Sequence, residues 1–302
     1  MFKNRTIQTW TALIVFIFSF SGGLSAQIYQ GDTQKQTDLP QLVDQVKPGT
    51  VLIVGEVHGL KPVHDQHIEL LNSLRAKGLK VSVGMEFFNY TDQVFIDQYR
   101  TGEIDETAFL KIINWGSGFD FNFYKEELLF AKKEFGEFGL GINLNRDVTK
   151  VISKQGVDAL SEDQKKLLPP NFTIGRDSYR QRFFKAMGHP VPLASLENYF
   201  VAQSAWDDTM AWQIVEFQKQ HPDQIFVVIV GEFHVQYGGG LPNRLRERLN
   251  LEKLPVDILT VSQVYTEGMS DQDIQGSLKP LVNEGPRANF IWLSKSLNNI
   301  AK

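Results

Sequence analysis

The chain has 302 residues and contains no cysteine. It therefore has no disulfides, thiolate metal centres, iron–sulfur clusters or cysteine nucleophiles. Hydrophobic residues make up 42% of the chain and charged residues 22%, as in ordinary globular proteins, which argues against disorder and coiled coil. The formal net charge of −4 gives no basic excess, so we expect no nucleic-acid partner.

The start of the chain has the pattern of a secretory signal. A basic beginning precedes an apolar stretch, and small residues lead up to Ala26. The apolar stretch is shorter than the roughly 20 residues of a membrane span. Gln27 stands where a lipoprotein would have cysteine, so we expect no lipid anchor. We predict a signal peptide over 1–26 and an exported, soluble protein, periplasmic or secreted, with a single domain over 27–302.

Segments with the composition of β-strands recur along the rest of the chain. Four are rich in β-branched residues and poor in charge, as expected of strands that are buried on both faces: 51–56, 80–88, 140–144 and 225–230. A fifth apolar segment covers 258–264. Near the end of the chain, 290–293 has the composition of a late edge strand.

Helical patterns separate these strands. They cover 62–77, 123–135, 147–155, 194–220 and 243–249. The alternation of strands and helices predicts an α/β fold with a mainly parallel central sheet. The arginine-containing segment 160–192 is expected to be a helical, lid-like insertion, and 266–289 is expected to be a loop.

A near-duplicate sequence ends two of the predicted strands. Residues 51–58 read Val-Leu-Ile-Val-Gly-Glu-Val-His, and residues 227–234 read Val-Val-Ile-Val-Gly-Glu-Phe-His. Apolar strand residues often match by chance, whereas a Gly-Glu-x-His tail rarely does. The tail places a glutamate and a histidine at the carboxyl end of each strand, after a glycine that permits a tight turn.

A third predicted strand also ends in a glutamate, so three carboxylates and two imidazoles follow strands of one sheet. Ligands of open α/β sheets bind at the carboxyl ends of the strands, so we expect a shared functional site there. The alternative is a structural network of buried polar pairs. The candidate residues are Glu56, His58, Glu86, Glu232 and His234.

Two further histidines, His64 and His67, are spaced to share one face of the predicted helix over 62–77. Two histidines on one helix face can bind a metal. We favour the simpler interpretation, which is a polar face exposed to solvent.

Several short motifs follow one another between residues 44 and 264. They are Gly55-Glu56-Val57-His58, Gly84-Met85-Glu86-Phe87-Phe88, Trp115 with Phe121 and Tyr124, Gln203-Ser204-Ala205-Trp206-Asp207 with Met210 and Ala211, and the block from Gly231 to His234 that continues to Arg244 and Leu245. In this order they resemble the ChaN-like haem-binding family of the Tiki superfamily. The lipoprotein cysteine familiar from that family is missing here.

The resemblance implies haem as the cofactor, a role in haem or iron uptake at the bacterial envelope, and a three-layer α/β fold. It leaves a homodimer and an outer-membrane haem transport system open as partners. Superfamily relatives include Tiki-type metalloproteases, in which the two Gly-x-x-His histidines and a glutamate hold a metal, and erythromycin-esterase-like hydrolases. The alternative function is therefore a hydrolase that uses zinc, manganese or cobalt on His58, Glu86 and His234.

A haem site needs an apolar slot, an axial ligand and cations that pair with the propionates. The candidate ligands are, in order, Tyr237, Tyr124, His58 and His234. Arg146 and Arg244 are the candidates for pairing with the propionates, or with carboxylates of the site instead.

Overall fold

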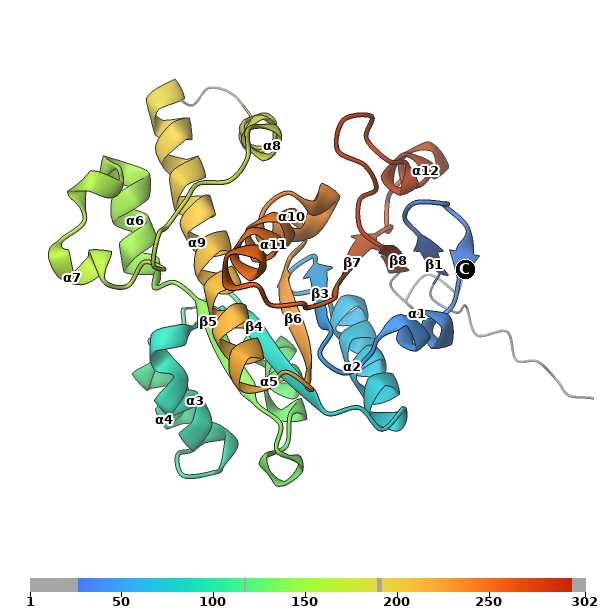
Figure 1. The fold of residues 1–302 in the computed structure, drawn as a ribbon, viewed down its shortest axis with the longest axis horizontal. Helices are drawn as coiled ribbons and strands as arrows, with labels where there is room; N and C mark the ends of the chain where they lie inside the picture. Colours follow the sequence, from blue (N-terminus) through green and yellow to red (C-terminus); the bar gives the residue numbers. More distant parts are fainter. Residues whose placement is uncertain (1–26, 117, 189–191, 295–302) are drawn as a thin grey trace, which may run out of the picture.

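Pairing of apolar strands builds one sheet at the centre of the fold. The computed structural model describes residues 27–116, 118–188 and 192–294, and the predicted signal peptide at 1–26 lies outside them. The sheet has eight strands in the order β2-β1-β8-β7-β3-β6-β4-β5 (Figure 1). These strands are β1 (Gln27–Gln30), β2 (Gln36–Thr37), β3 (Val51–Glu56), β4 (Val81–Asn89), β5 (Gly139–Asn143), β6 (Ile225–Gly231), β7 (Ile258–Tyr265) and β8 (Phe290–Ser294).

The strands from β8 to β5 run parallel to one another, while β1 joins β8 and β2 in antiparallel pairs. β3 lies in the interior of the sheet, between β7 and β6, and all six of its residues are buried. A parallel sheet with helices on both faces requires such continuous apolar strands. Because of this requirement, the apolar composition of β3 and β6 was enough to predict them from the sequence.

Helices cover both faces of the sheet and make it the middle of three layers (Figure 1). Over the described residues they are α1 (Leu39–Gln45), α2 (Lys61–Ala76), α3 (Gln93–Arg100), α4 (Glu106–Ile112), α5 (Lys125–Phe130), α6 (Arg146–Gln155), α7 (Glu162–Lys165), α8 (Asp177–Met187), α9 (Leu193–Gln220), α10 (Glu232–Val235), α11 (Leu241–Glu252) and α12 (Asp271–Leu278). The predicted three-layer α/β fold with a mainly parallel sheet is confirmed.

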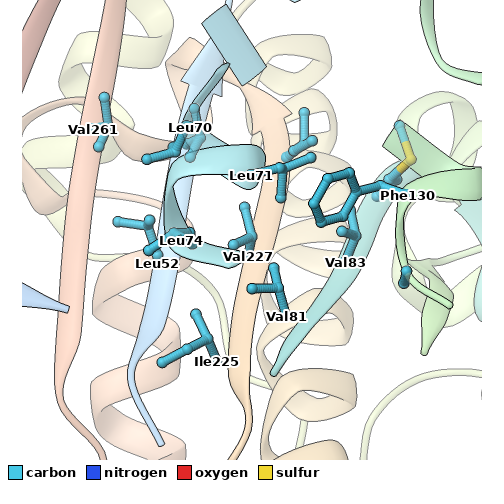
Figure 2. Packing of buried hydrophobic residues seen from close by; sticks show 14 of the residues in the cluster. Leu52, Leu70, Leu71, Leu74, Val81, Val83, Phe130, Ile225, Val227 and Val261 are labelled. Carbon is cyan, nitrogen blue, oxygen red and sulfur yellow. The ribbon is translucent and has the colours of Figure 1, made fainter. Parts of the chain in front are cut away.

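Alternate residues of each central strand enter different hydrophobic clusters, because successive side chains of a strand point to opposite faces. Leu52 packs in the cluster that contains Leu70 and Leu71 of α2, whereas Ile53 packs in the cluster that contains Met210 of α9. Figure 2 shows the first of these clusters, with the leucines of α2 lying over β3 and β6. The two clusters hold α2 and α9 on opposite faces of the sheet.

The predicted late edge strand at 290–293 is wrong in its position, because β8 is an inner strand. It pairs with β7 on one side and with β1 on the other, and its Trp292 is buried. β1 has only four residues, too few to show a strand pattern in the sequence.

Two other elements differ from the expected ones. The segment 266–289, expected as a loop, contains α12, whose first turn is capped by the side chain of Ser270. The helix expected over 123–135 is limited to α5, with 3₁₀ turns at Phe121–Phe123 and Lys133–Phe135 on either side. Gly136, with a φ of +68°, closes this segment before β5 begins.

The segment expected as an insertion, 160–192, contains α7 and α8 in its described part. Within the part of the chain that the structure describes, no helix has both the length and the apolar character needed to cross a membrane.

Replacing Leu71 by alanine should lower the free energy of unfolding by about 2–5 kcal/mol, because the truncation leaves a cavity between α2 and the sheet. Leu71 is fully buried, whereas Leu251 is 77% exposed and provides the matched control. Leu251→Ala should change stability by less than about 0.5 kcal/mol. Urea unfolding followed by circular dichroism measures both variants. Equal effects would contradict the packing of α2 against the sheet.

Candidate functional site

A pocket of about 750 Å³ lies at the carboxyl ends of β3, β4 and β6. We call it the strand-end pocket. Its aromatic residues are Phe87, Phe88, Trp115, Phe119, Phe183, Trp206 and Phe233. The five residues predicted to share a site, Glu56, His58, Glu86, Glu232 and His234, all line it. The pocket thus combines several aromatic side chains with a set of carboxylates and imidazoles.

The pairing of β3 with β6 brings the two Gly-Glu-x-His tails together. Glu56 is the register partner of Gly231, so both strands end at the same level of the sheet. A Cβ atom on Gly231 would lie 2.9 Å from the His58 ring. Glycine at this position therefore leaves room for the imidazole that follows β3.

Glu86, which belongs to β4, lies between the two histidines. Its Oε1 is 3.4 Å from Nε2 of His58, and its Oε2 is 3.4 Å from Nε2 of His234. The backbone N–H of Gly231 donates a hydrogen bond of 2.9 Å to Oε2. Three neighbouring strands thus hold this carboxylate and both imidazoles in one cluster.

His58 is the more exposed of the two imidazoles, with 35% of its side chain accessible. Its Nδ1 lies 2.8 Å from Oε1 of Glu56, and its ring meets Phe87 and Phe119 edge-on. Burial alone would lower the pKa of His58, but Glu56 and Glu86 outweigh this effect and raise it. The carboxylate of Glu56 therefore fixes the orientation of a ring that lies in the pocket.

His234, on α10, is buried and paired with a carboxylate from α9. Its Nδ1 lies 2.7 Å from Oδ1 of Asp207. Burial would lower the pKa of His234, but the charges of Asp207 and Glu86 raise it to about 9. We did not single out Asp207 as a site residue, although it stands in the Gln203-to-Asp207 motif. Its role depends on a contact between α9 and α10 that no spacing in the sequence reveals.

The remaining candidates divide between the pocket and the surrounding structure. Arg146 lines the pocket and is exposed to solvent. Glu232 also lines it, but its Oε1 accepts hydrogen bonds from Ser262 and Arg287. Arg244 is buried outside the pocket lining, where its Nε donates to Oδ1 of Asp208.

Neither candidate tyrosine is among the residues that line the pocket. Tyr237 has a φ of +58°, and its ring lies near the guanidinium groups of Arg182 and Arg287. Tyr124 is fully buried, with its ring centroid 3.8 Å from that of Phe87. Burial and the nearby carboxylates, Glu56 first among them, raise the pKa of Tyr124 and keep it a neutral phenol.

The interpretation of His64 and His67 as an exposed polar face is wrong. Both side chains are buried, at 5% and 2% exposure. Nδ1 of His64 lies 2.7 Å from Oε1 of Glu127, and Nδ1 of His67 lies 3.1 Å from the same oxygen. This face of α2 turns inward toward Glu127 of α5 and Glu56 of β3, and helical spacing alone cannot show which polar face is covered.

The described part of the segment 160–192 contributes to one wall of the pocket. Phe183, Ala186 and Met187 of α8 line it, and Met187 is 42% exposed. The ring of Phe183 packs against Phe200 of α9 and Phe233 of α10. An aromatic cluster therefore anchors α8 beside the strand ends.

Several solved structures are similar to this chain. The ChaN protein of Campylobacter jejuni, described as showing cofacial heme binding, matches with a TM-score of 0.65 and 18% identity, over 90% of this chain and 97% of that one. The type III effector HopBA1 matches at 14% identity over 91% of this chain and 99% of that one, with a TM-score of 0.45. A mutant of the erythromycin esterase EreC matches at 12% identity over 79% of this chain and 77% of that one, with a TM-score of 0.42.

No curated protein matches the sequence. A family model described as "Haem-binding uptake, Tiki superfamily, ChaN" matches residues 42–245. This match covers the signature motifs from Gly55 to Leu245 and confirms the resemblance inferred from them. The chain therefore belongs to the ChaN family of haem-binding uptake proteins in the Tiki superfamily.

Proposed function

We propose that this chain binds haem in the strand-end pocket, with His58 as the axial ligand, and that it serves haem or iron uptake after export. One observation carries the proposal. An imidazole oriented by a carboxylate lies in a pocket that is also lined by seven phenylalanine and tryptophan side chains. The family match supports haem as the ligand and favours it over the metal-dependent hydrolase considered from the same glutamates and histidines.

The pocket has the size and chemistry of a cofactor site. Its volume of about 750 Å³ falls within the range of about 300–1,000 Å³ that is typical of ligand pockets. Phe87 and Phe119 flank His58, and Trp206 and Phe233 also line the pocket. A porphyrin buries a large apolar surface, which aromatic walls of this kind accommodate.

His58 fits the role of axial ligand because of its partner on the other ring nitrogen. Histidines that bind a metal usually donate the N–H of the second nitrogen to a carboxylate or carbonyl. Nδ1 of His58 lies 2.8 Å from Oε1 of Glu56, so in the neutral ring an N–H at Nδ1 leaves the lone pair on Nε2, and the iron would take the place beside Nε2 that now faces Glu86. Nδ1 of His234 lies in the same way beside Oδ1 of Asp207. Only 10% of the His234 side chain is exposed, however, so its ring is less accessible to a ligand than that of His58.

Arg146 is the residue of the pocket that suits a haem propionate. It is the first residue of α6, is exposed, and lines the pocket. Arg244, the other candidate, pairs with Asp208 and Glu247. We therefore assign the propionate contact to Arg146.

We propose export because of the pattern of 1–26, a basic start, an apolar stretch and small residues up to Ala26. A homodimer and an outer-membrane transport partner stay predictions that depend on haem being the cargo.

Substituting His58 with alanine should weaken hemin binding at least about tenfold, because the iron loses its axial ligand. A titration with hemin, followed by the Soret band, measures the affinity. Tyr124→Phe and Tyr237→Phe should bind as the unaltered chain does, and His221→Ala, at a histidine outside the pocket lining, is the control. Loss of the Soret shift in a tyrosine variant, with hemin binding by His58→Ala unaffected, would identify that tyrosine as the axial ligand. No saturable shift in the unaltered chain would overturn the proposed function itself.

Replacing Arg146 with alanine should weaken hemin binding by a factor of roughly two to five, which corresponds to an exposed ion pair of up to about 1 kcal/mol. The loss should shrink at high salt, and it should vanish for a haem whose propionates are esterified. Lys154→Ala, an exposed cation in the last turn of the same helix, is the matched control. An equal loss with the esterified haem would rule out a contact between Arg146 and a propionate.

When the whole chain is expressed in a Gram-negative cell, N-terminal sequencing of the accumulated protein should begin at Gln27, and cell fractionation should place it outside the cytoplasm. A chain that retains the segment before Gln27 and remains in the cytoplasm would contradict export, while leaving haem binding to the titration above.

A further inference from the structure

We propose that Glu56, His64 and His67 form a buried site for one divalent cation of the zinc class, behind the strand-end pocket. This site goes beyond haem binding and uses neither His58 nor His234. One carboxylate oxygen of Glu56, a nitrogen of His64 and a nitrogen of His67 all lie within 4.8 Å of one another. The residues come from β3 and the first turns of α2, and each is at most 5% exposed.

The distances between these atoms suit a small cation. Nε2 of His64 and Nδ1 of His67 each lie 3.7 Å from Oε2 of Glu56. Zinc bonds of about 2.1 Å in a tetrahedral site separate neighbouring ligand atoms by about 3.4 Å. The two distances from the carboxylate to the imidazoles are therefore within a few tenths of an ångström of this spacing, and the two imidazole nitrogens lie within 4.8 Å of each other.

The hydrogen bond at Nδ1 of His64 leaves its other ring nitrogen, Nε2, free to bind a metal. Nδ1 of His64 lies 2.7 Å from Oε1 of Glu127, so the ring proton belongs on Nδ1 and the lone pair on Nε2. This pairing of a ligand imidazole with a second carboxylate is the usual support of a metal-binding histidine.

The tautomer of His67 is fixed by an amide. Nε2 of His67 lies 2.7 Å from Oε1 of Gln263. The amide cannot be turned around, because its Nε2 donates to the carbonyl of Val63 at 3.2 Å and to Oε1 of Gln66 at 3.0 Å. His67 therefore donates from Nε2, and in the neutral ring that binds a metal the lone pair of Nδ1 faces Oε2 of Glu56 and Oε1 of Glu127 at 3.7 and 3.1 Å.

The charges of the cluster also call for a cation. The carboxylates of Glu56 and Glu127 have no exposed surface, and their ion pairs within the described residues are all with histidines. With neutral imidazoles, two negative charges would be buried without compensation, which is strongly unfavourable. A divalent cation bound to Glu56, His64 and His67 balances these charges.

Buried polar atoms without hydrogen bonds converge on the same place. Among the described residues, no hydrogen-bond partner lies within reach of Glu56 Oε2, His64 Nε2 or Glu127 Oε2. Buried polar groups are nearly always hydrogen-bonded, so a concentration of exceptions at atoms that bind metals indicates a ligand.

The atom types select the class of metal. Two imidazole nitrogens and a carboxylate oxygen are typical ligands of zinc and of its first-row neighbours. Calcium and magnesium prefer oxygen ligands alone. Zinc is the expected ion, and Co²⁺ is the spectroscopic probe, because it accepts the same geometry and absorbs visible light.

The experiment uses the haem-free full chain after treatment with a chelator. Titration with Co²⁺ should give visible absorption that saturates at one equivalent, and zinc should displace the cobalt. His64→Gln and His67→Gln should each weaken binding at least about tenfold. His58→Gln is the matched control, because His58 contacts the other oxygen of the same Glu56 and should leave metal binding intact. Zinc should also raise the melting temperature of the unaltered chain and of His58→Gln, but not that of His67→Gln.

The outcomes distinguish a metal ion bound to Glu56, His64 and His67 from protonated histidines and from a metal ion bound in the pocket. Absence of one-equivalent binding, with no zinc effect on the melting temperature, would mean that protonated imidazoles balance the carboxylates, and it would overturn the proposal. Binding that is lost in His58→Gln and His234→Gln but kept in His64→Gln and His67→Gln would place the metal in the pocket and overturn it equally. If His64→Gln fails to fold, His67→Gln decides. The hemin titration is read separately at the Soret band, so failure of one proposal is distinguishable from failure of the other.

Discussion

The in-register pairing of β3 with β6 is the interaction on which the site depends. Parallel strands align their carboxyl ends, and here Glu56 is paired with Gly231. The two Gly-Glu-x-His tails therefore emerge side by side, and β4 adds Glu86 between the imidazoles. A shift of one residue in this register would turn the strand side chains to the opposite face of the sheet and separate His58 from Glu86.

Buried carboxylates connect several of the elements around the site, because each must be compensated by a partner. Asp207 is buried against His234, Asp208 against Arg244 and Arg248, and Glu56 against three histidines. Glu56 has a double role, since one of its oxygens faces His58 in the pocket and the other faces His64 and His67 behind it. The proposed haem pocket and the proposed cation site therefore share one carboxylate while they use different histidines.

Particular residues show how far the sequence could predict the site. The repeated strand ends sufficed to bring Glu56, His58, Glu86, Glu232 and His234 to one pocket, because strand direction alone fixes where such residues emerge. The aromatic segment was recognised, but not the inward turn of Tyr124, which depends on how α5 meets α2. Arg244 was chosen as a cation near the second motif, whereas its partner Asp208 lies on α9 and is distant in sequence.

The sequence by itself determined the strands, the α/β layering and the group of glutamates and histidines at one sheet edge. These follow from local apolar patterns and from the geometry of parallel strands, which need no knowledge of distant contacts. Only the tertiary structure decided that His64 and His67 are buried against Glu127, that Asp207 supports His234, and that β8 is an inner strand. Those features arise from packing between elements far apart in the chain, and no spacing within one element encodes which neighbour covers it.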